Sequence, residues 1–378
     1  MATESIEKLL TRIASTAGRS FDQAMALPPR AYFSEELLGA ELERIFKRDW
    51  ICIGHVSRLV RDGDYFTAQL VGTPVIALRD KENKIRILSN SCRHRGAQIL
   101  AGAGRVNLLV CPYHGWSYDR SGLLLSAPGL PSHATDGCRL PELRHEIWHG
   151  WIFVSLDPDA PALEPRLQGL AELFAHYETE RLQCLFTADE QWPVNWKMLV
   201  ENFMESYHLA AVHKKTLNRT TPVSGVECWP GGVGYAYHTL KIRRDRKDQL
   251  PFDEERPAQI RDREVLSCIF PSNLISVTPR TAVSLTVQPA GVEQLKASFA
   301  FYVNPDYLES VGQTKSEAER ELRKGFDAFN AEDKEIVSRL AEGLRSSLAK
   351  AGPLGPLERP LWEFHRYLAT KLVDSFSS

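Results

Sequence analysis

Apolar and polar positions change period along the chain. Between Ser34 and Lys47, apolar residues recur at intervals of three and four, which predicts an amphipathic helix. From Trp50 onward, short β-prone runs are separated by turn residues such as Asp, Gly and Asn, which predicts antiparallel strands. These runs occupy 51–54, 65–68, 73–78, 85–88 and 148–156. The first part of the chain is therefore expected to form a compact β unit.

A proline-bearing link at 157–161 follows the last of these runs. Beyond it, long helical patterns at 194–213 and 315–349 flank β-like stretches within 224–304. Helices around an antiparallel sheet make this part, and the chain as a whole, α+β. The predicted organisation is a helical segment at 1–40 that packs on the last domain, an all-β domain at 41–158, and a helix-flanked sheet domain at 159–378.

Composition and charge argue against a nucleic-acid-binding, membrane-spanning or disulfide-bonded secreted protein. The chain has 378 residues and a formal net charge of −2, which gives no reason to expect nucleic acid or an anionic membrane as a partner. It has no apolar run long enough to span a membrane, and its N-terminus lacks a basic start and an apolar core. Its seven cysteines are an odd number and are widely scattered, which is typical of thiols in a reducing compartment. We therefore expect a cytoplasmic enzyme.

Two short loops carry a metal-ligand pattern. The sequences CRHRG at 92–96 and CPYHGW at 111–116 give the spacing C-x-H-x16-C-x2-H. Two thiolates and two imidazoles suit a [2Fe-2S] cluster in which Cys92 and Cys111 hold one iron, while His94 and His114 hold the other. Such ligation raises the reduction potential into a window of roughly −150 to +300 mV.

The alternative for these four residues is zinc, which also takes two cysteines and two histidines. A zinc finger, however, pairs Cys with Cys and His with His. Here each loop contributes one residue of each type, so each loop would touch both irons of a binuclear cluster. The spacing favours the cluster, and the paired loops resemble those of Rieske proteins.

A second constellation lies in the segment 195–213, which reads NWKMLVENFMESYHLAAVH. On a regular helix Glu201, Glu205 and His208 are neighbours on one face, but His213 lies five residues beyond His208. The helix must therefore end, bulge or bend if both imidazoles are to converge. Two histidines with one carboxylate from elsewhere form the facial triad of non-haem Fe(II) oxygenases. The same segment is also compatible with a solvated helix face.

Together these segments resemble Rieske non-haem iron oxygenases, specifically the catalytic α subunits of ring-hydroxylating and related oxygenases. The resemblance covers nearly the whole chain and includes a late helix with Glu332, Asp333 and Ile336. It implies one Rieske [2Fe-2S] cluster and one mononuclear Fe(II) per subunit, the latter held by His208, His213 and Asp333. Apolar residues at 336, 337, 340 and 344 place Asp333 on an inward stripe. Glu332 and Asp327 are alternative third ligands.

The resemblance also implies a homotrimer in which subunits pack head to tail. Glu205 would then join His114 of one subunit to His208 of the next, which orients both imidazoles. Asn202 and Tyr207 flank this site, where they either orient ligands and oxygen or have a structural role alone.

The resemblance further implies an electron donor. A flavin and iron–sulfur reductase, or a ferredoxin, would deliver electrons from NAD(P)H one at a time to the cluster, and dioxygen would be the co-substrate.

Glutamate at position 205, after Met204, resembles the branch that oxidises quaternary ammonium compounds such as choline, glycine betaine and carnitine. The region 269–276 and the ending 362–368 resemble that branch as well, and the aromatics of the latter suggest either a cation-binding cage or core. Other departures, among them Arg280, leave room for an anionic or aromatic substrate. The expected reaction is hydroxylation or oxidative dealkylation of a small organic molecule.

Two further alternatives remain open at this point. An arene or aryl carboxylate dioxygenase would keep both metal sites and change the substrate. A Rieske electron-transfer protein would keep the cluster and lack the mononuclear iron. The substrate, the choice between mono- and dioxygenation, the reductase and the presence of a small β subunit are not encoded in these patterns.

Overall fold

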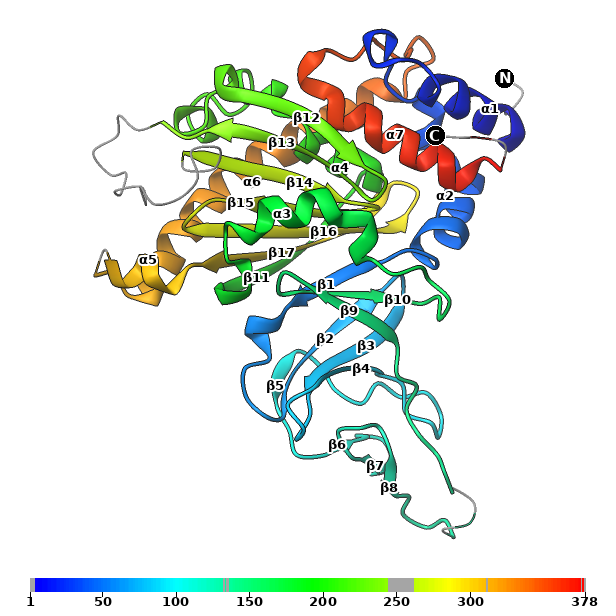
Figure 1. Ribbon diagram of the computed structural model, residues 1–378. Coiled ribbons are helices and arrows are strands. Elements are labelled where there is room, and N and C mark those ends of the chain that lie inside the picture. The colour runs from blue at the N-terminus through cyan, green and yellow to red at the C-terminus, as the bar shows by residue number, and fades with distance from the viewer. Residues whose placement is uncertain are drawn as a thin grey trace. The chain divides into compact units, whose positions relative to one another are not determined.

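The computed structural model describes residues 4–131, 133, 136–243, 262–310, 312–374 and 376. Contacts divide the chain into two compact units, one formed by Met1–Ile45 with Ala162–Ser378 and the other by Phe46–Pro161. The sequence patterns placed the corresponding boundaries after residues 40 and 158. We call these the catalytic-side unit and the loop-bearing unit, and Figure 1 shows their elements.

The loop-bearing unit is built from short antiparallel strands, as its hydrophobic pattern predicts. They form a sheet of order β1-β10-β9, a sheet of order β4-β3-β2-β5 and a small sheet of order β6-β7-β8. The strands are β1 (Ile51–His55), β2 (Asp64–Leu70), β3 (Thr73–Arg79), β4 (Ile85–Ser89), β5 (Ala103–Arg105), β6 (Leu109–Val110), β7 (Ser117–Tyr118), β8 (Leu124–Ser126), β9 (Arg144–Trp148) and β10 (Trp151–Ser155).

The run at 148–156 is a hairpin rather than one strand. His149 and Gly150 both have positive φ values, 47° and 86°, and connect Trp148 directly to Trp151. A two-residue turn with both residues in the left-handed region matches the twist of the flanking strands. The continuous apolar run concealed this turn because Trp148 and Trp151 are both buried.

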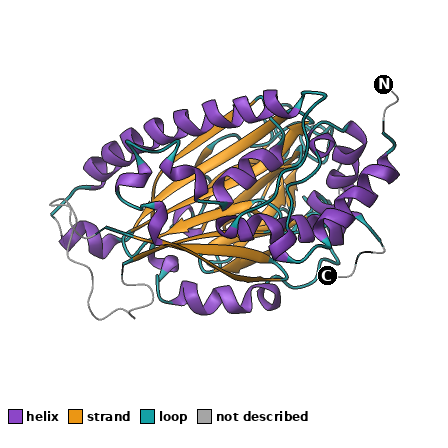
Figure 2. Ribbon diagram, turned by 90° about the horizontal axis from the view of Figure 1, so that it is seen from above, coloured by secondary structure: helices purple, strands orange, loops and turns teal. Residues whose placement is uncertain are grey.

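The catalytic-side unit is organised around a seven-stranded antiparallel sheet of order β11-β17-β16-β15-β14-β13-β12. Figure 2 shows its helices lying over the strands. The strands are β11 (Gln183–Trp192), β12 (Val226–Gly232), β13 (Tyr235–Lys241), β14 (Arg263–Ile269), β15 (Asn273–Val277), β16 (Thr281–Gly291) and β17 (Gln294–Val303). The α+β fold predicted from the sequence is confirmed. Residues 244–261 of the predicted β region lie outside the described residues.

Helices of this unit include one within each of the predicted ranges 34–47, 194–213 and 315–349, and others for which the patterns gave no bounds. They are α1 (Ile6–Ala17), α2 (Glu35–Glu41), α3 (Gln168–Ala175), α4 (Trp196–Met204), α5 (Pro305–Ser310), α6 (Lys315–Leu344) and α7 (Arg359–Leu372). A π-helical turn at Leu42–Phe46 continues α2, so the amphipathic pattern from Ser34 is accounted for. No helix among the described residues is long and apolar enough to cross a membrane.

Helix α4 is held in the core by buried polar contacts as well as apolar ones. It contacts strands β13 to β17. At its N-terminus, Lys197 donates to the Glu41 carboxylate of α2 at 2.6 Å, and Trp196 Nε1 donates to the same carboxylate at 2.7 Å. One turn later, Glu201 accepts from Tyr32 at 2.8 Å and lies 2.9 Å from His365 Nε2. The N-terminal segment and α7 are thereby attached to the helix that leads into the second constellation.

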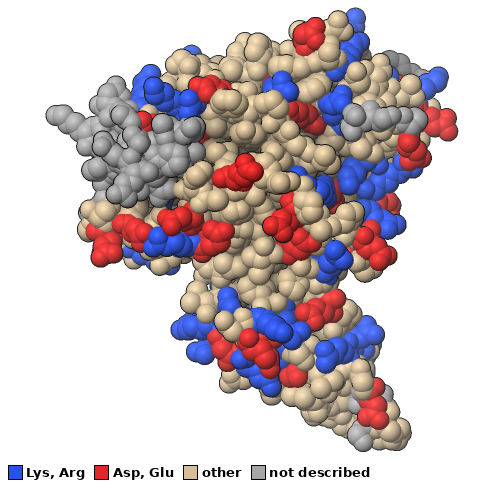
Figure 3. Space-filling view, viewed as in Figure 1, with Lys and Arg blue, Asp and Glu red and all other residues tan. Residues whose placement is uncertain are grey.

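Basic and acidic side chains are interspersed over the face shown in Figure 3. This distribution matches the near-neutral formal charge of −2. All seven cysteines are free thiols.

Two candidate metal sites

The two cysteine–histidine loops adopt matched turns. In the first, Gly96 N–H donates to the Cys92 carbonyl at 2.9 Å; in the second, Gly115 N–H donates to the Cys111 carbonyl at 3.0 Å. Both glycines have positive φ values, 77° and 72°, which a residue with a Cβ adopts only at a cost. The local sequence thus folds both loops in the same way and presents one Cys and one His from each.

Within these loops the thiols and imidazoles point to different surroundings. Cys92 and Cys111 belong to a buried cluster with Ile76, Leu88 and Trp116, whereas His94 and His114 are exposed. The two imidazole Nδ1 atoms lie 3.2 Å apart. Buried thiolates on one iron and exposed, neutral imidazoles on the other would fit a binuclear iron–sulfur cluster.

The zinc alternative requires all four ligand atoms around a single ion. Among the described residues, three potential ligand atoms gather within 4.8 Å of one another at His208, His213 and Asp333, and the loop residues form no such group. The Tyr118 hydroxyl lies 3.2 Å from Cys92 Sγ and accepts from the Arg93 N–H at 3.0 Å. Burial, followed by the neighbouring Cys92 thiol, raises the pKa of Tyr118, so its hydroxyl remains available as a donor to sulfur.

The second constellation begins where α4 ends. Asn195 caps the helix through its side chain, which accepts from the Lys197 N–H at 3.1 Å, and the last helical residue is Met204. Glu205 is extended, and its carboxylate accepts from the N–H groups of Tyr207 and His208. A short 3-10 turn over Tyr207–Ala210 follows. The helical pattern over 194–213 therefore does not form one regular helix. Helix α4 ends at Met204 and Glu205 caps a new turn, which is the break that convergence of His208 and His213 requires.

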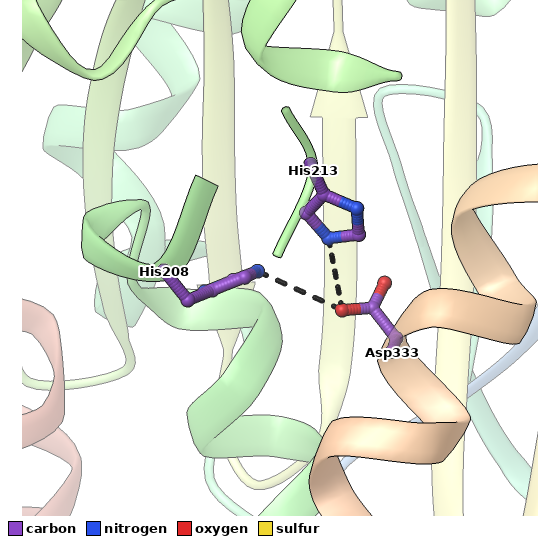
Figure 4. Close-up of side chains that lie close together, drawn as sticks. All are labelled: His208, His213 and Asp333. Carbon is purple, nitrogen blue, oxygen red and sulfur yellow. Dashed lines mark hydrogen bonds and ion pairs between the residues drawn. The ribbon is translucent and has the colours of Figure 1, made fainter. Parts of the chain in front are cut away.

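This change of direction brings His208 and His213 together with Asp333 of α6. His213 Nε2 lies 3.0 Å from Asp333 Oδ1, and His208 Nε2 lies 3.6 Å from the same oxygen (Figure 4). His213 is fully buried, and its side chain comes from a segment 120 residues away from Asp333. Two imidazole nitrogens and one carboxylate oxygen thus converge, and these three donors match the ligand set of a mononuclear Fe(II) site.

Each member of this triad has an outer partner. Glu205 contacts His208 Nδ1 at 2.5 Å, Glu332 contacts His213 Nδ1 at 2.7 Å, and Asn202 donates to Asp333 Oδ1 at 2.9 Å. These contacts fix both ring orientations, which is the usual role of groups behind metal-binding histidines. Burial lowers the pKa of His213, but Asp333 and Glu332 outweigh that effect and raise it.

The structure separates the alternatives for the carboxylate. Glu332 lies behind His213 and also accepts from Thr216 Oγ1 at 2.6 Å, so it is occupied on the far side of the ring. Asp327 is not part of the group within 4.8 Å. The predicted apolar stripe around Asp333 is only partly correct, because Val337 is buried but Leu340 is 46% exposed.

Other predicted candidates lie away from the triad. Phe364 and Tyr367 of α7 are buried and pack on Phe270, so these aromatics belong to the core and do not form a cage. The guanidinium of Arg280 lies over the Tyr307 ring at 5.8 Å. Burial lowers the pKa of Arg280, and the nearby Tyr307 and Asp262 offset this in part.

Sequence patterns did not identify His238 as a neighbour of this constellation. Its Nε2 lies 2.7 Å from Ser206 Oγ. Burial, followed by the charge of His208, lowers the pKa of His238 to about 3. The side chains around it are closely packed and leave no space for a water molecule; they are Phe203, Met204, Ala236, Leu266, Ser267, Cys268 and Pro360. A lone histidine within a β-prone run carries no signal that would have marked it.

These two sites on an all-β unit and a helix-flanked sheet unit define a class of protein, the Rieske oxygenases. Comparison with family models agrees: the Rieske [2Fe-2S] domain matches residues 49–142, and the ring hydroxylating alpha subunit (catalytic domain) matches residues 171–374. The chain belongs to the ring hydroxylating alpha subunit family and is an oxidoreductase. Its two domains imply a Rieske cluster and a mononuclear iron.

Two relatives that match most of this chain are named for quaternary ammonium substrates. The carnitine monooxygenase oxygenase subunit of Escherichia coli (strain K12) is 26% identical over 368 residues, covering 93% of this chain and 95% of the relative. The glycine betaine monooxygenase oxygenase subunit of Pseudomonas aeruginosa (strain PAO1) is 25% identical over 374 residues, covering 89% and 86%.

Solved structures share the fold at low identity. A quaternary ammonium Rieske monooxygenase in complex with L-carnitine superposes with a TM-score of 0.79 at 23% identity, covering 95% of this chain and 98% of the other. Naphthalene 1,2-dioxygenase from Rhodococcus sp. bound to indole also gives 0.79, at 21% identity and complete coverage of both chains. The fold alone therefore does not choose the substrate.

Proposed function

We propose that this chain is the oxygenase component of a multicomponent system that hydroxylates or oxidatively dealkylates a small quaternary ammonium or N-alkyl compound. The observation that carries the proposal is the convergence of His208, His213 and Asp333 in a chain that also carries the paired Cys–His loops. One site would accept electrons, and the other would bind dioxygen beside the substrate.

The ligand assignment follows from the donor atoms. Cys92 and Cys111 would hold one iron of the cluster, and His94 and His114 the other. His208, His213 and Asp333 would hold the mononuclear Fe(II). When bound, the cluster supplies single electrons and the mononuclear ion supplies the reduction of dioxygen.

The protein's own residues orient these groups. Glu205 holds His208 through Nδ1 and leaves Nε2 directed at the Asp333 carboxylate. Asn202 fixes the rotation of that carboxylate through Oδ1. Because Glu332 occupies the far nitrogen of His213, both imidazoles keep the tautomer that a metal ligand requires.

We assign Glu205 a second role as the link between subunits of a homotrimer. His114 is exposed, so it is open to contact from a second copy of the chain. Glu205 is partly buried and lies close in sequence to Tyr207, which is 64% exposed. A carboxylate that touches an imidazole of each site would couple the protonation of one to the redox state of the other.

The substrate class is supported by the named activities of the relatives on carnitine and glycine betaine and by the Met204–Glu205 pair. At the carbon next to nitrogen, one oxygen atom from O2 would enter a C–H bond while two electrons and two protons convert the other to water. The hydroxylated carbon then loses its bond to nitrogen, which leaves with the electron pair and takes the hydroxyl proton, so an aldehyde and a protonated amine are released.

A single aromatic ring is the second candidate substrate. The fold is shared with an arene dioxygenase as well as with a quaternary ammonium monooxygenase, so it does not exclude this substrate.

The electron donor in this proposal is a flavin and iron–sulfur reductase, or a ferredoxin, that draws on NAD(P)H. The free thiols are consistent with a reducing, cytoplasmic setting. Purified protein with a surrogate reductase should consume oxygen on addition of L-carnitine, glycine betaine or another N-alkyl compound. Consumption with benzoate or arenes alone would instead support the dioxygenase alternative.

Metal analysis separates the oxygenase from a simple electron carrier. About three irons per chain and a Rieske-type EPR signal after dithionite reduction are expected for the oxygenase. Two irons with no oxygen uptake would leave only the electron-transfer protein. Glu205→Ala should retain all three irons and lose coupled turnover, whereas unchanged turnover would remove the bridging role.

A further inference from the structure

A groove of about 570 Å³ opens on the loop-bearing unit, between the edges of two sheets. Strands β4 and β9 each lie at the edge of their sheet. The segment 141–143 holds these edges together, because Ser89 N–H donates to the Pro141 carbonyl and Leu143 N–H donates to the Ile87 carbonyl, both at 2.8 Å. From residue 144 onward β9 pairs with β10 instead. The groove lies where β9 and the start of β4 part.

Part of the groove wall is apolar. Val56, Ile85 and Ile147 line it, and Ile147 is 49% exposed. The volume falls within the roughly 300–1,000 Å³ that is usual for small-molecule sites. Ile85 begins β4 and Ser89 ends it, shortly before the first cluster loop, so the groove and that loop are separated by about 13 Å along the strand. The groove is therefore distinct from the proposed cluster site.

Arg79 and Lys84 bring unused hydrogen-bond donors to this groove. Arg79 donates through Nε to the Leu59 carbonyl and through Nη1 to the backbone and side-chain oxygens of Asn83, the latter two at 2.9 Å. These bonds fix the guanidinium, yet its Nη2 donates to none of the described residues. The ammonium of Lys84 is exposed and likewise has no hydrogen bond or ion pair within the described part of the chain.

Arg86 is the third cation, and two carboxylates hold it in place. Its Nε donates to Asp80 at 2.6 Å and its Nη1 to Glu142 at 3.0 Å, which leaves Nη2 without an acceptor among the described residues. Three cations against these two carboxylates leave a surplus of one positive charge. His145 also lines the groove; its Nδ1 donates to the Leu143 carbonyl at 3.2 Å, so Nε2 is the nitrogen open to a ligand.

We propose that this groove binds a small organic anion, whose oxygens meet the free donors of Arg79, Lys84 and Arg86 while its apolar body contacts Ile85 and Ile147. Guanidinium N–H groups match the geometry of carboxylate and phosphate oxygens alike, and the lysine adds a point charge. A ligand held in this way joins the β3–β4 turn to β9 and stabilises the loop-bearing unit by mass action. The inference does not depend on the substrate of the enzyme.

The test measures binding of matched probes to the iron-loaded full chain by isothermal titration calorimetry. Phenylacetate and phenylacetamide have nearly the same shape and differ in charge. Phenyl phosphate and inorganic phosphate share the charged group and differ in the apolar body. We expect each aromatic anion to bind about 10-fold or more tightly than its partner probe, because a charged hydrogen bond or a buried ring is worth that much. The tighter of the two aromatic anions identifies the preferred oxyanion.

Two lysines of one turn provide the matched variants. Lys84→Gln removes a free cation of the groove, whereas Lys81→Gln removes a lysine whose side chain is 76% exposed and does not line it. We expect Lys84→Gln to weaken both aromatic anions about 5- to 10-fold and Lys81→Gln to leave them unchanged. Ile147→Ser should weaken phenyl phosphate and leave inorganic phosphate as it was, since it removes only apolar contact.

Three results would overturn the proposal. They are a wild-type protein that binds neither aromatic anion, equal binding of phenylacetate and phenylacetamide, and a Lys84→Gln variant that behaves like Lys81→Gln. Visible absorbance of the cluster shows that the loop-bearing unit of each variant is folded, so a loss of binding then reports on the groove itself. The proposed function is tested separately by oxygen uptake and remains in place whichever result is obtained.

Discussion

Asn202 shows how a single residue controls the mononuclear site. Its amide donates to Asp333 Oδ1, the atom that both histidines approach. Asn202→Ala removes that hydrogen bond, so we expect the affinity for mononuclear iron to fall roughly 10- to 100-fold. Iron titration of the purified variant measures this loss, and the visible absorbance of the cluster serves as an internal control. An unaltered affinity would make Asn202 a packing residue only.

At this scale the sequence was informative where chemistry restricts the choice of residue. Cys92, His94, Cys111 and His114 could be selected because few functions need that set at that spacing. His238 could not, because a histidine in a β-prone run is ordinary until the structure places it beside Ser206.

Between elements, the buried pair of Glu41 and Lys197 joins α2 to α4. Both side chains are 1% exposed, and they lie 2.6 Å apart. Removing one partner leaves an uncompensated charge in the core, so Glu41→Ala should lower the free energy of unfolding by about 3–5 kcal/mol. Combining Glu41→Leu with Lys197→Met should restore much of this. Urea unfolding of the catalytic-side unit, followed by tryptophan fluorescence, compares the single and double variants.

The β3–β4 hairpin carries a pH-dependent contact in the loop-bearing unit. Burial raises the pKa of Asp80, but hydrogen bonds from the Lys84 N–H, from Arg86 and from the Glu82 N–H lower it by more. A carboxyl whose pKa is lowered on folding stabilises the fold above its ordinary pKa of about 3.9, and this contribution is lost as the pH falls through the lower, folded value.

Asp80→Asn is therefore expected to destabilise the unit by about 1–3 kcal/mol at pH 7. The difference from the wild type should shrink as the pH is lowered below about 4. Thermal melts followed by circular dichroism at several pH values, on protein that folds reversibly, measure both effects. A difference that stays constant down to pH 2 would show that the Asp80 charge is not involved.

Element boundaries were predictable except where a side chain ends one element and begins the next. The period of apolar residues continues through 194–213, yet Glu205 turns its carboxylate back to the N–H groups of Tyr207 and His208. Periodicity describes which side of a helix is buried and contains no information about such a cap. The hairpin at His149 and Gly150 was missed for a related reason, since burial on both sides of the turn kept the run apolar.

At the scale of the whole molecule, the proposed trimer predicts that two inactive variants can restore activity to each other when they assemble together. A Cys92→Ser variant lacks a functional cluster, and an Asp333→Ala variant lacks a functional mononuclear site. Each should be inactive alone. If electrons cross between subunits, trimers that contain both variants should recover about a third of wild-type activity, because one of their three contacts then joins two intact sites.

Co-expression with two different affinity tags isolates the mixed trimers for this assay. Mixed trimers with no activity would show that electrons move within one chain. The residue pattern alone could not predict assembly, because an exposed histidine such as His114 is equally compatible with a monomer and with a trimer.

The separation of 120 residues between His213 and Asp333 affects how long the folded enzyme resists degradation. An ion bound to both residues acts as a reversible cross-link that closes a long loop, and anything that binds only the folded state stabilises it by mass action. Removal of iron should therefore loosen α6 from the turn that carries the histidines and expose both to proteases. Scarcity of iron would then shorten the survival of the protein as well as stop its turnover.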